Sequence, residues 1–334
     1  MSDSPGRSRT GVALGAAALS VAACGSDAVT DHGRAYIALH ADHALVVDAR
    51  ALKRRVVASL AGGAPEPIGL SGAVLAREIA RRNNIEFLLD GLGPGYRDRV
   101  DVTLTPVARE GDHTSYQLVV RDPALPGPIN ARVLAPAASA LELSDDGELT
   151  AAPGSLRPGV VLGLHGHGQT PDGFARDHLG HELADRGFLV VIPFFEPHAC
   201  GDPEAATSAL LLEHGFTLIG IWAYQSLAVL ELLSEWDAIA PAGFGILAHS
   251  GGSVLARLVT PLTGRVVARV LDHESLYNGL CSGQIHCETV PDLYQISGDI
   301  NAADASPATL KVPYGFPDRD VRAAIVHFFE DVLR

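Results

Sequence analysis

The chain has 334 residues, of which 47% are hydrophobic and 19% are charged, so most of it is expected to be globular. This length suffices for one large domain and a small one. The formal net charge is −14 and no basic tract stands out, which excludes nucleic acid as an expected partner.

The first residues have the composition of an export signal. Arg7 and Arg9 precede the 13-residue apolar stretch GVALGAAALSVAA, which Cys24 follows directly. The stretch is too short to span a bilayer as a stable helix. Residues 21–24, VAAC, resemble a bacterial lipobox, in which the cysteine is lipidated and becomes the new N-terminus.

We therefore predict that residues 1–24 are a lipoprotein-type signal segment and that Cys24 carries a lipid anchor. The protein is expected to be exported, either as a membrane-anchored lipoprotein or as a periplasmic or extracellular protein. A cleaved signal peptide with an incidental cysteine, and a cytoplasmic protein, are the alternatives. An oxidising compartment permits one disulfide among the remaining cysteines, and the short spacing of Cys281 and Cys287 predicts that these two are joined, leaving Cys200 over.

Residues 25–97 are expected to form an N-terminal helical cover on the main domain. Apolar residues recur there at mostly helical spacing, and Ser71 can cap a second helix that stops near Gly91. This segment carries no obvious chemistry.

Residues 98–334 have the pattern of an α/β domain. The alternating runs VDVTLTPVARE and TSYQLVVRD flank the turn at residues 110–112 and predict a hairpin, with INARVLAPA as a third strand. Four apolar runs follow and alternate with helical stretches: VVLGLH, FLVVIPF, FGILAH and RVVARVL. This alternation predicts a mostly parallel sheet with helices on both faces.

Two of the expected strand ends carry unusual residues, and sites in such sheets lie at the carboxyl ends of the strands. Residues 248–252 read AHSGG, between the apolar run FGILAH and a helical stretch. The small residues Ala248 and Gly252 approach the pattern G-x-S-x-G of a nucleophile elbow, which predicts Ser250 as a nucleophile. The alternative is a serine in an ordinary glycine loop.

The second strand end reads HGHGQ, residues 165–169. An acyl-transfer serine needs backbone N–H groups aimed at the developing oxyanion. One comes from the residue after the nucleophile, here Gly251, and the other from a loop of the H-G-x-G type. A metal site at His165 and His167 is the alternative, but no third histidine follows at motif spacing, so neither a metal nor a cofactor is expected.

At this point the chain resembles a known family. The runs ARVLAP, VVLGLHGHGQ, LADRGFLVVIP and GILAHSGGS are similar to the dienelactone-hydrolase and acetyl-xylan-esterase branch of the α/β-hydrolase superfamily. The resemblance covers roughly residues 98–334. It implies an oxyanion loop after the third strand and the serine after the fifth. It also implies Ser250 as the nucleophile, with Gly251 and the region of His167 and Gly168 as oxyanion donors.

The C-terminal part departs from the family, which places an acid after the seventh strand and a histidine after the eighth. Asp299, after LYQISG, matches the acid, but Tyr314 occupies the histidine position. His327 lies off the apolar stripe of the last helix and does not replace that histidine. Only eight residues separate Asp299 from Ala308, too few for a parallel crossover. Either one strand–helix unit is shortened, or LYQISGD is not a central strand.

The loop after the sixth strand, DHESLYNGLCSGQIHCETVPD, offers other bases. We prefer His286, because a bridge between the two cysteines of this loop would fix it. His273 is the second candidate, and a third reading leaves both histidines without a catalytic part. A neutral tyrosine is a poor base at neutral pH because its pKa is about 10.

The sequence thus predicts a serine ester hydrolase that acts on small carboxylic esters through an acyl-enzyme, with Ser250, His286 and Asp299 as catalytic residues. Its expected partners are a small-molecule ester and, through the lipid anchor, a membrane. The rival prediction is a catalytically silent binding or scaffold lipoprotein that keeps the fold without a full triad. A zinc hydrolase is a third reading.

Overall fold

The structure is a computed structural model of the whole chain. It describes residues 26–45, 47–48, 51, 66–139, 141–144, 149–151, 157–195, 202–239, 243–272, 290, 293–303, 307–316 and 318–334. Cys24 and residues 273–289, with His273, His286 and two cysteines, lie outside these ranges.

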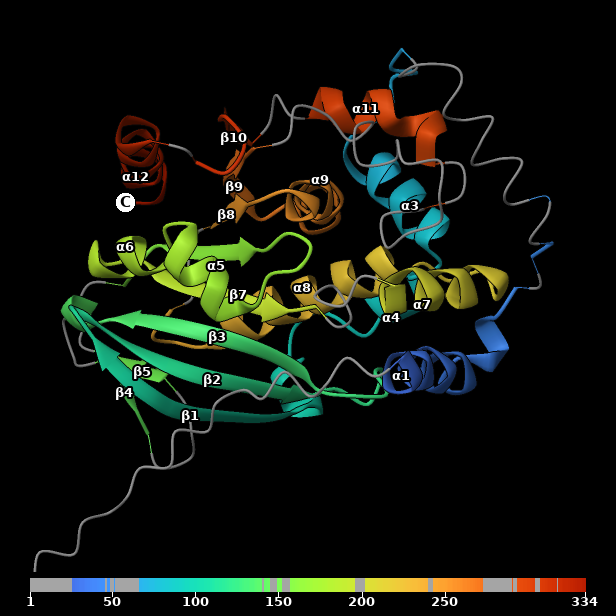
Figure 1. Cartoon of the computed structure of the whole chain (residues 1–334), viewed down its shortest axis with the longest axis horizontal. Coiled ribbons are helices and arrows are strands. Elements are labelled where there is room, and N and C mark those ends of the chain that lie inside the picture. Colours follow the sequence, from blue (N-terminus) through green and yellow to red (C-terminus); the bar gives the residue numbers. More distant parts are fainter. Residues whose placement is uncertain are drawn as a thin grey trace, which may run out of the picture.

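One eight-stranded sheet organises the fold, in the order β1-β2-β3-β7-β6-β8-β9-β10 (Figure 1). The first three strands are antiparallel, β3 is antiparallel to β7, and the pairs from β7 to β10 are parallel. The strands are β1 (Asp101–Glu110), β2 (His113–Arg121), β3 (Ile129–Pro136), β6 (Val160–Leu164), β7 (Leu189–Phe194), β8 (Phe244–Ala248), β9 (Val266–Leu271) and β10 (Ala308–Lys311). A separate ribbon pairs β4 (Leu141–Leu143) with β5 (Leu149–Ala151).

Helices cover both faces of the parallel strands, which explains why the central strands β6, β7 and β8 are apolar throughout. Successive residues of β7 belong to different cores: Val190 and Ile192 pack into one, and Leu189 and Val191 into the other. The first core is covered by α5 (Pro171–Asp177), α6 (Gly180–Asp185) and α12 (Arg319–Leu333). The second is covered by α8 (Leu218–Glu235) and α9 (Gly251–Thr263). Accordingly α12 and α9 lie on opposite sides of β8 (Figure 1).

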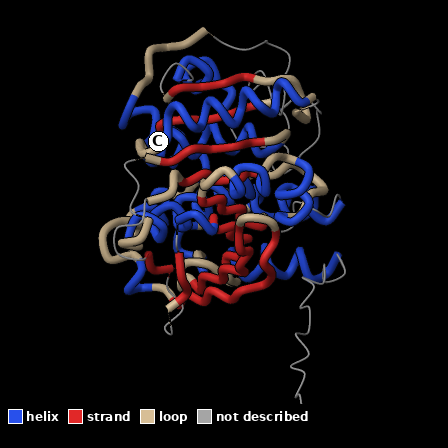
Figure 2. The backbone as a smooth tube through the Cα atoms, turned by 90° about the vertical axis from the view of Figure 1, so that its left-hand side faces the viewer, coloured by secondary structure: helices blue, strands red, loops and turns tan. Residues whose placement is uncertain are grey.

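The N-terminal helices pack on the α8–α9 side, where they extend the larger core. They are α1 (Ser26–Leu39), α3 (Gly72–Asn83) and α4 (Glu86–Leu89). Helix α1 contacts α7 (Asp202–Glu213), and α3 contacts α9. Tyr36, Ile79 and Leu88 are buried in the same core as the sheet. Figure 2 shows the helices packed around the strands from a perpendicular direction.

Short helices complete the described part of the chain. Helix α11 (Ser297–Ala302) follows a 3-10 turn, and the 3-10 turns are Ala41–His43, Arg97–Arg99, Ala137–Ser139 and Leu293–Ile296. The sequence LYQISG therefore forms helical turns, so the second of the two readings given for it is right. Because the antiparallel unit at the start has three strands, HGHGQ follows the fourth strand of the main sheet and Ser250 the sixth, each one later than the family count.

Among the described helices, none is by itself long and apolar enough to cross a membrane. Residues Glu204–Glu213 and Leu218–Glu235 meet that criterion only together, as a pair bent by 97°.

Candidate active site

Ser250 lies on a sharp turn between the buried strand β8 and the helix α9. Its backbone angles are φ 53° and ψ −123°. A positive φ is uncommon for a residue with a side chain and costs about 1 to 3 kcal/mol. The turn follows the carboxyl end of β8, in the middle of the sheet. The strained strand-to-helix turn predicted from AHSGG is therefore present, and it has the backbone form of a nucleophile elbow.

Close packing between α9 and β6 explains why the residue two positions after Ser250 is a glycine. A Cβ atom at Gly252 would lie 2.0 Å from the carbonyl oxygen of Leu164 and 2.6 Å from its carbonyl carbon. Ala248 is fully buried in β8, where it pairs with Leu164 on one side and Leu271 on the other. Small residues two before and two after Ser250 thus let the helix begin directly against the sheet.

The loop after β6 passes immediately beside Ser250. A Cβ atom at Gly166 would lie 2.7 Å from the Cβ atom of Ser250. Gly168 adopts a positive φ of 71°, which turns the loop back toward α5. On the other side, Gly251 is the first residue of α9, so its N–H has no intrahelical partner. Two backbone segments therefore meet at Ser250, as oxyanion stabilisation requires.

A buried histidine fixes this loop to the neighbouring strand. The hydrogen-bond network assigns His165 a neutral form, in which Nδ1–H donates to the Gly166 carbonyl (3.1 Å) and Nε2 accepts from the Phe195 N–H (3.4 Å). Burial lowers the pKa of His165 to about 4. With both ring nitrogens engaged inside the protein, His165 acts as a loop anchor and offers no lone pair to a metal ion.

Gln169 holds the same loop from its other end. Its Oε1 accepts the Gly166 N–H at 2.9 Å, and its Nε2 donates to His178 Nε2 at 2.6 Å. The Gly166 N–H is therefore already bonded, which leaves the positions after it as the expected oxyanion donors of this loop. His167 points elsewhere: its Nε2 lies 3.2 Å from the buried Glu204 carboxylate.

The carboxylate of Asp272 fixes the turn at Ser250 through hydrogen bonds. Asp272 directly follows β9, and it accepts the Ser250 N–H (2.8 Å), the Ser253 hydroxyl (3.1 Å) and the Gly315 N–H (3.0 Å). His249 Nδ1 donates to the same carboxylate. Burial alone would raise the pKa of Asp272, but the hydrogen bonds from His249, Gly315 and Ser250 and the Coulomb effect of His249 outweigh it and lower the pKa below its ordinary value.

Aromatic rings stack beside the elbow. The ring of His249 lies 4.1 Å from that of His178, nearly parallel to it, and 4.9 Å from that of Tyr314. Burial lowers the pKa of His178 to about 4, so its ring is neutral at pH 7. Within the described part of the chain, no side chain hydrogen-bonds the Ser250 hydroxyl, His178 and His249 included.

Comparison of the whole chain with solved structures identifies its architecture. No protein-family model matches the sequence, and no curated protein matches it. A "putative acetyl xylan esterase" from Bacteroides fragilis superimposes with a TM-score of 0.50 at 14% identity, over 83% of this chain and 88% of that one. The protein has the α/β-hydrolase fold.

Looser matches come from the same fold. Acetyl xylan esterase 1 from Thermoanaerobacterium sp. gives a TM-score of 0.45 at 12% identity, over 86% of this chain and 99% of that one. Dienelactone hydrolase from Anabaena variabilis gives 0.38 at 15% identity, over 71% and 100%. The fold predicted from the apolar runs and the two glycine motifs is confirmed by the sheet topology and by the match at a TM-score of 0.50.

In this α/β-hydrolase fold, Asp299 has a different place from the predicted one. It lies in α11 rather than after a strand, and its two carboxylate oxygens accept the backbone N–H groups of Ile68 (3.2 Å), Gly69 (2.7 Å) and Leu70 (2.8 Å). A carboxylate engaged by three N–H groups of the N-terminal cover is a structural clasp. The predicted place of Asp299 after a strand is wrong, because the apolar run before it is helical.

Tyr314, which the sequence resemblance assigned to the histidine position, lies beside the Ser250 turn. It follows β10, the eighth strand of the main sheet, and its ring contacts His249. Because the count runs one later than in the family, β10 corresponds to the family's seventh strand, after which the family places the acid. Gly315, next to it, bonds to Asp272. Tyr314 is therefore near the site, and among the described residues no strand follows β10 that could carry a histidine after it. His286 belongs to residues 273–289, which begin directly after Asp272 and lie outside the described ranges.

Sequence reasoning missed the pair formed by His249 and Asp272. Both residues were in view, one inside the serine motif and the other at the start of the loop after β9. The available signal was strand adjacency: β8 and β9 are parallel neighbours, and Ala248 pairs with Leu271. The residues that follow these two positions, His249 and Asp272, must then end up side by side.

Proposed function

We propose that the protein is a serine ester hydrolase that acts on small carboxylic esters through an acyl-enzyme on Ser250. The observation that carries the proposal is the backbone of Ser250, at φ 53° and ψ −123°, with the Gly166 loop packed against its Cβ atom. A serine held in this strain beside two backbone segments is arranged for acyl transfer. Acetyl xylan esterases, by name, act on esters of a small acyl group, which agrees with this class of substrate.

The reaction follows from the residues around the elbow. A base takes the proton of the Ser250 hydroxyl while its oxygen attacks the ester carbonyl carbon. The N–H of Gly251 and an N–H from the region of His167 and Gly168 donate to the oxyanion. The alcohol leaves with the proton from the base. Water then attacks the acyl-enzyme while the base takes its proton, and the carboxylic acid leaves as the base returns that proton to the Ser250 oxygen.

The proposal keeps His286 as the base. None of the described side chains hydrogen-bonds the Ser250 hydroxyl, and the segment that carries His286 begins directly after Asp272 at the same sheet edge. In the proposal Asp272, rather than Asp299, is the carboxylate at this site. It positions Ser250 and His249 through hydrogen bonds. The proposal also includes export and a lipid anchor at Cys24, for which the VAAC motif is the support.

Serine labelling and turnover together test the proposal. The purified protein should react with a fluorescent phosphonate and should hydrolyse p-nitrophenyl acetate. Ser250→Ala should abolish labelling and lower turnover by about 10⁴-fold to 10⁶-fold. Ser234→Ala is the matched control, because Ser234 lies in α8 and its hydroxyl donates to the Glu231 carbonyl. That variant should keep both signals.

The same assay identifies the base. His286→Ala should lower turnover by a similar factor, and added imidazole should restore part of it. If His286→Ala retains full turnover while Ser250→Ala does not, the nucleophile stands and the base assignment fails. If Ser250→Ala hydrolyses the ester as fast as the unmodified protein and neither is labelled, the ester-hydrolase proposal itself is refuted.

A further inference from the structure

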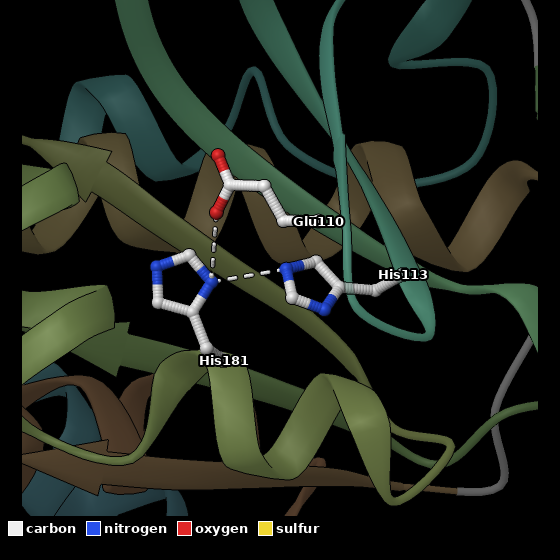
Figure 3. A group of neighbouring side chains, drawn as sticks. All are labelled: Glu110, His113 and His181. Carbon is white, nitrogen blue, oxygen red and sulfur yellow. Dashed lines mark hydrogen bonds and ion pairs between the residues drawn. The ribbon is translucent and has the colours of Figure 1, made fainter.

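A second cluster of reactive side chains lies at the end of the sheet opposite Ser250, where the parallel strands begin. Glu110 ends β1, His113 begins β2, and His181 lies on α6 (Figure 3). Glu110 and His113 are direct partners across the hairpin. One atom from each of the three side chains lies within 4.8 Å of the others. Two imidazoles and one carboxylate therefore converge from the hairpin and the helix.

The distances within the cluster are close to those of a shared ligand sphere. His113 Nε2 is 2.9 Å from His181 Nδ1, which in turn is 3.5 Å from Glu110 Oε2. Ligands bound tetrahedrally at about 2.0 to 2.1 Å from a zinc ion lie about 3.3 Å apart. Movements of about 0.4 Å or less would bring these two pairs to that separation.

A fourth side chain, that of Asp185, orients His113. His113 is 1% exposed, and its Nδ1 lies 2.7 Å from the carboxylate of Asp185. Because this carboxylate accepts the proton of Nδ1, the lone pair of Nε2 faces the cluster. A carboxylate behind a histidine is the usual outer partner of a zinc ligand. Asp185 is itself fixed, because its Oδ1 also accepts the Asp112 N–H at 3.0 Å.

The placement on α6 completes this arrangement. His181 and Asp185 are four residues apart and so lie on the same face of the helix. One of them faces the centre of the cluster and the other supports His113 from behind. The side chains of Glu110 and His181 are 51% and 32% exposed, so water can reach the cluster from outside and fill a fourth position.

We propose that Glu110, His113 and His181 form a site for one Zn²⁺ ion, with Asp185 as the outer partner of His113. Two histidines and a glutamate are a known zinc ligand set, and a water molecule would complete the tetrahedron. The ion would join the β1–β2 hairpin to α6. This site differs from the H-x-H pair considered in the sequence. Sequence spacing did not indicate it, because His181 on α6 follows the two ligands of the hairpin by 68 and 71 residues.

The zinc site is separate from Ser250. His113 pairs with Pro136 at the end of β3, and Leu134 pairs with Val190 near the start of β7. The cluster therefore lies at the edge where the parallel strands begin, whereas Ser250 follows the end of β8. Zinc bound there supports the fold and takes no part in the ester chemistry, so the two proposals can fail independently.

Equilibrium dialysis of tag-free protein against ZnCl₂, after treatment with EDTA, tests the site. The unmodified protein should retain one more zinc ion per chain than His181→Ala. It should also unfold about 4 °C higher when free Zn²⁺ is 100 times its dissociation constant. Asp185→Asn should weaken zinc binding by about 10-fold to 100-fold while leaving the three ligands in place.

His327→Ala serves as the matched control. His327 is exposed on α12 and lies 3.3 Å from the Glu330 carboxylate, so it has one imidazole and one carboxylate without a second histidine. This variant should bind zinc like the unmodified protein. Equal zinc content and equal thermal shifts in the unmodified protein and His181→Ala would overturn the proposal. His181 is partly exposed, so its replacement avoids the loss of core packing that His113→Ala would cause.

Discussion

Replacing Asp272 with asparagine keeps the shape of the side chain and turns one carboxylate oxygen into an NH₂ group, which can no longer accept a hydrogen bond. Each oxygen of Asp272 serves two donors: His249 and the Gly315 N–H on one, the Ser250 N–H and the Ser253 hydroxyl on the other. Whichever way the amide turns, two donors lose their acceptor. A hydrogen bond to a charged group contributes about 1.5 to 3 kcal/mol, so the loss is about 3 to 6 kcal/mol.

That loss is a large share of the free energy of unfolding, which is about 5 to 15 kcal/mol for most proteins. Urea denaturation at pH 7 should show it directly, and the thermal midpoint should fall by about 5 to 10 °C. Phosphonate labelling of Ser250, measured well below the midpoint, should slow by about 100-fold, because a displaced nucleophile reacts poorly.

Asp299→Asn is the matched control for Asp272→Asn, since Asp299 is equally buried and accepts three backbone N–H groups. It should also lose stability, but labelling of Ser250 should be unchanged. The reasoning fails if Asp272→Asn stays within 1 kcal/mol of the unmodified protein. It fails equally if Asp299→Asn, and not Asp272→Asn, suppresses labelling.

Three further outcomes are expected. Gly252→Ala should destabilise the protein by about 3 kcal/mol or more in urea, because its Cβ atom would meet the Leu164 carbonyl at 2.0 Å; unchanged stability would contradict the packing described. The pKa of His165 is about 4 in the folded protein and about 6.5 in the unfolded chain. As the pH falls from 6.5 to 4, the unfolded chain binds a proton that the folded protein does not, so the free energy of unfolding falls by about 3 kcal/mol over this range. Denaturation curves at several pH values should show this slope, and His165→Asn should reduce it while leaving the part that comes from His178, whose pKa is also lowered to about 4. Cys24→Ser should move the protein from the detergent phase to the aqueous phase, and unaltered partitioning would refute lipidation.

The sheet and the elbow could be predicted because their signals are local. An apolar run followed by Ala-His-Ser-Gly-Gly and a helical stretch specifies a strand, a tight turn and a helix within about 20 residues. The glycines at 166 and 252 were also readable, since each permits a close backbone approach that the structure shows. Fold class and the place of Ser250 follow from these features alone.

The rest depended on contacts between distant residues. LYQISG is short and apolar, and such a run is compatible with a strand or a helical turn, so the place of Asp299 was misjudged with it. The hydrogen bonds of Asp272 depend on the register between β8 and β9, which no local pattern reveals. The zinc ligands are joined only when α6 packs against the hairpin.

The clasp between Asp299 and residues 68–70 has a consequence for synthesis. The two partners are about 230 residues apart in the chain. At about 5 to 20 residues per second, the N–H groups of the cover leave the ribosome about 12 to 46 s before their carboxylate is made. Residues 68–70 must remain without their carboxylate through that interval, even where α1 and α3 have already packed against α7 and α9. A nascent chain stalled before Asp299 should therefore be cut by protease near residue 68, and a chain stalled after α12 has emerged should resist.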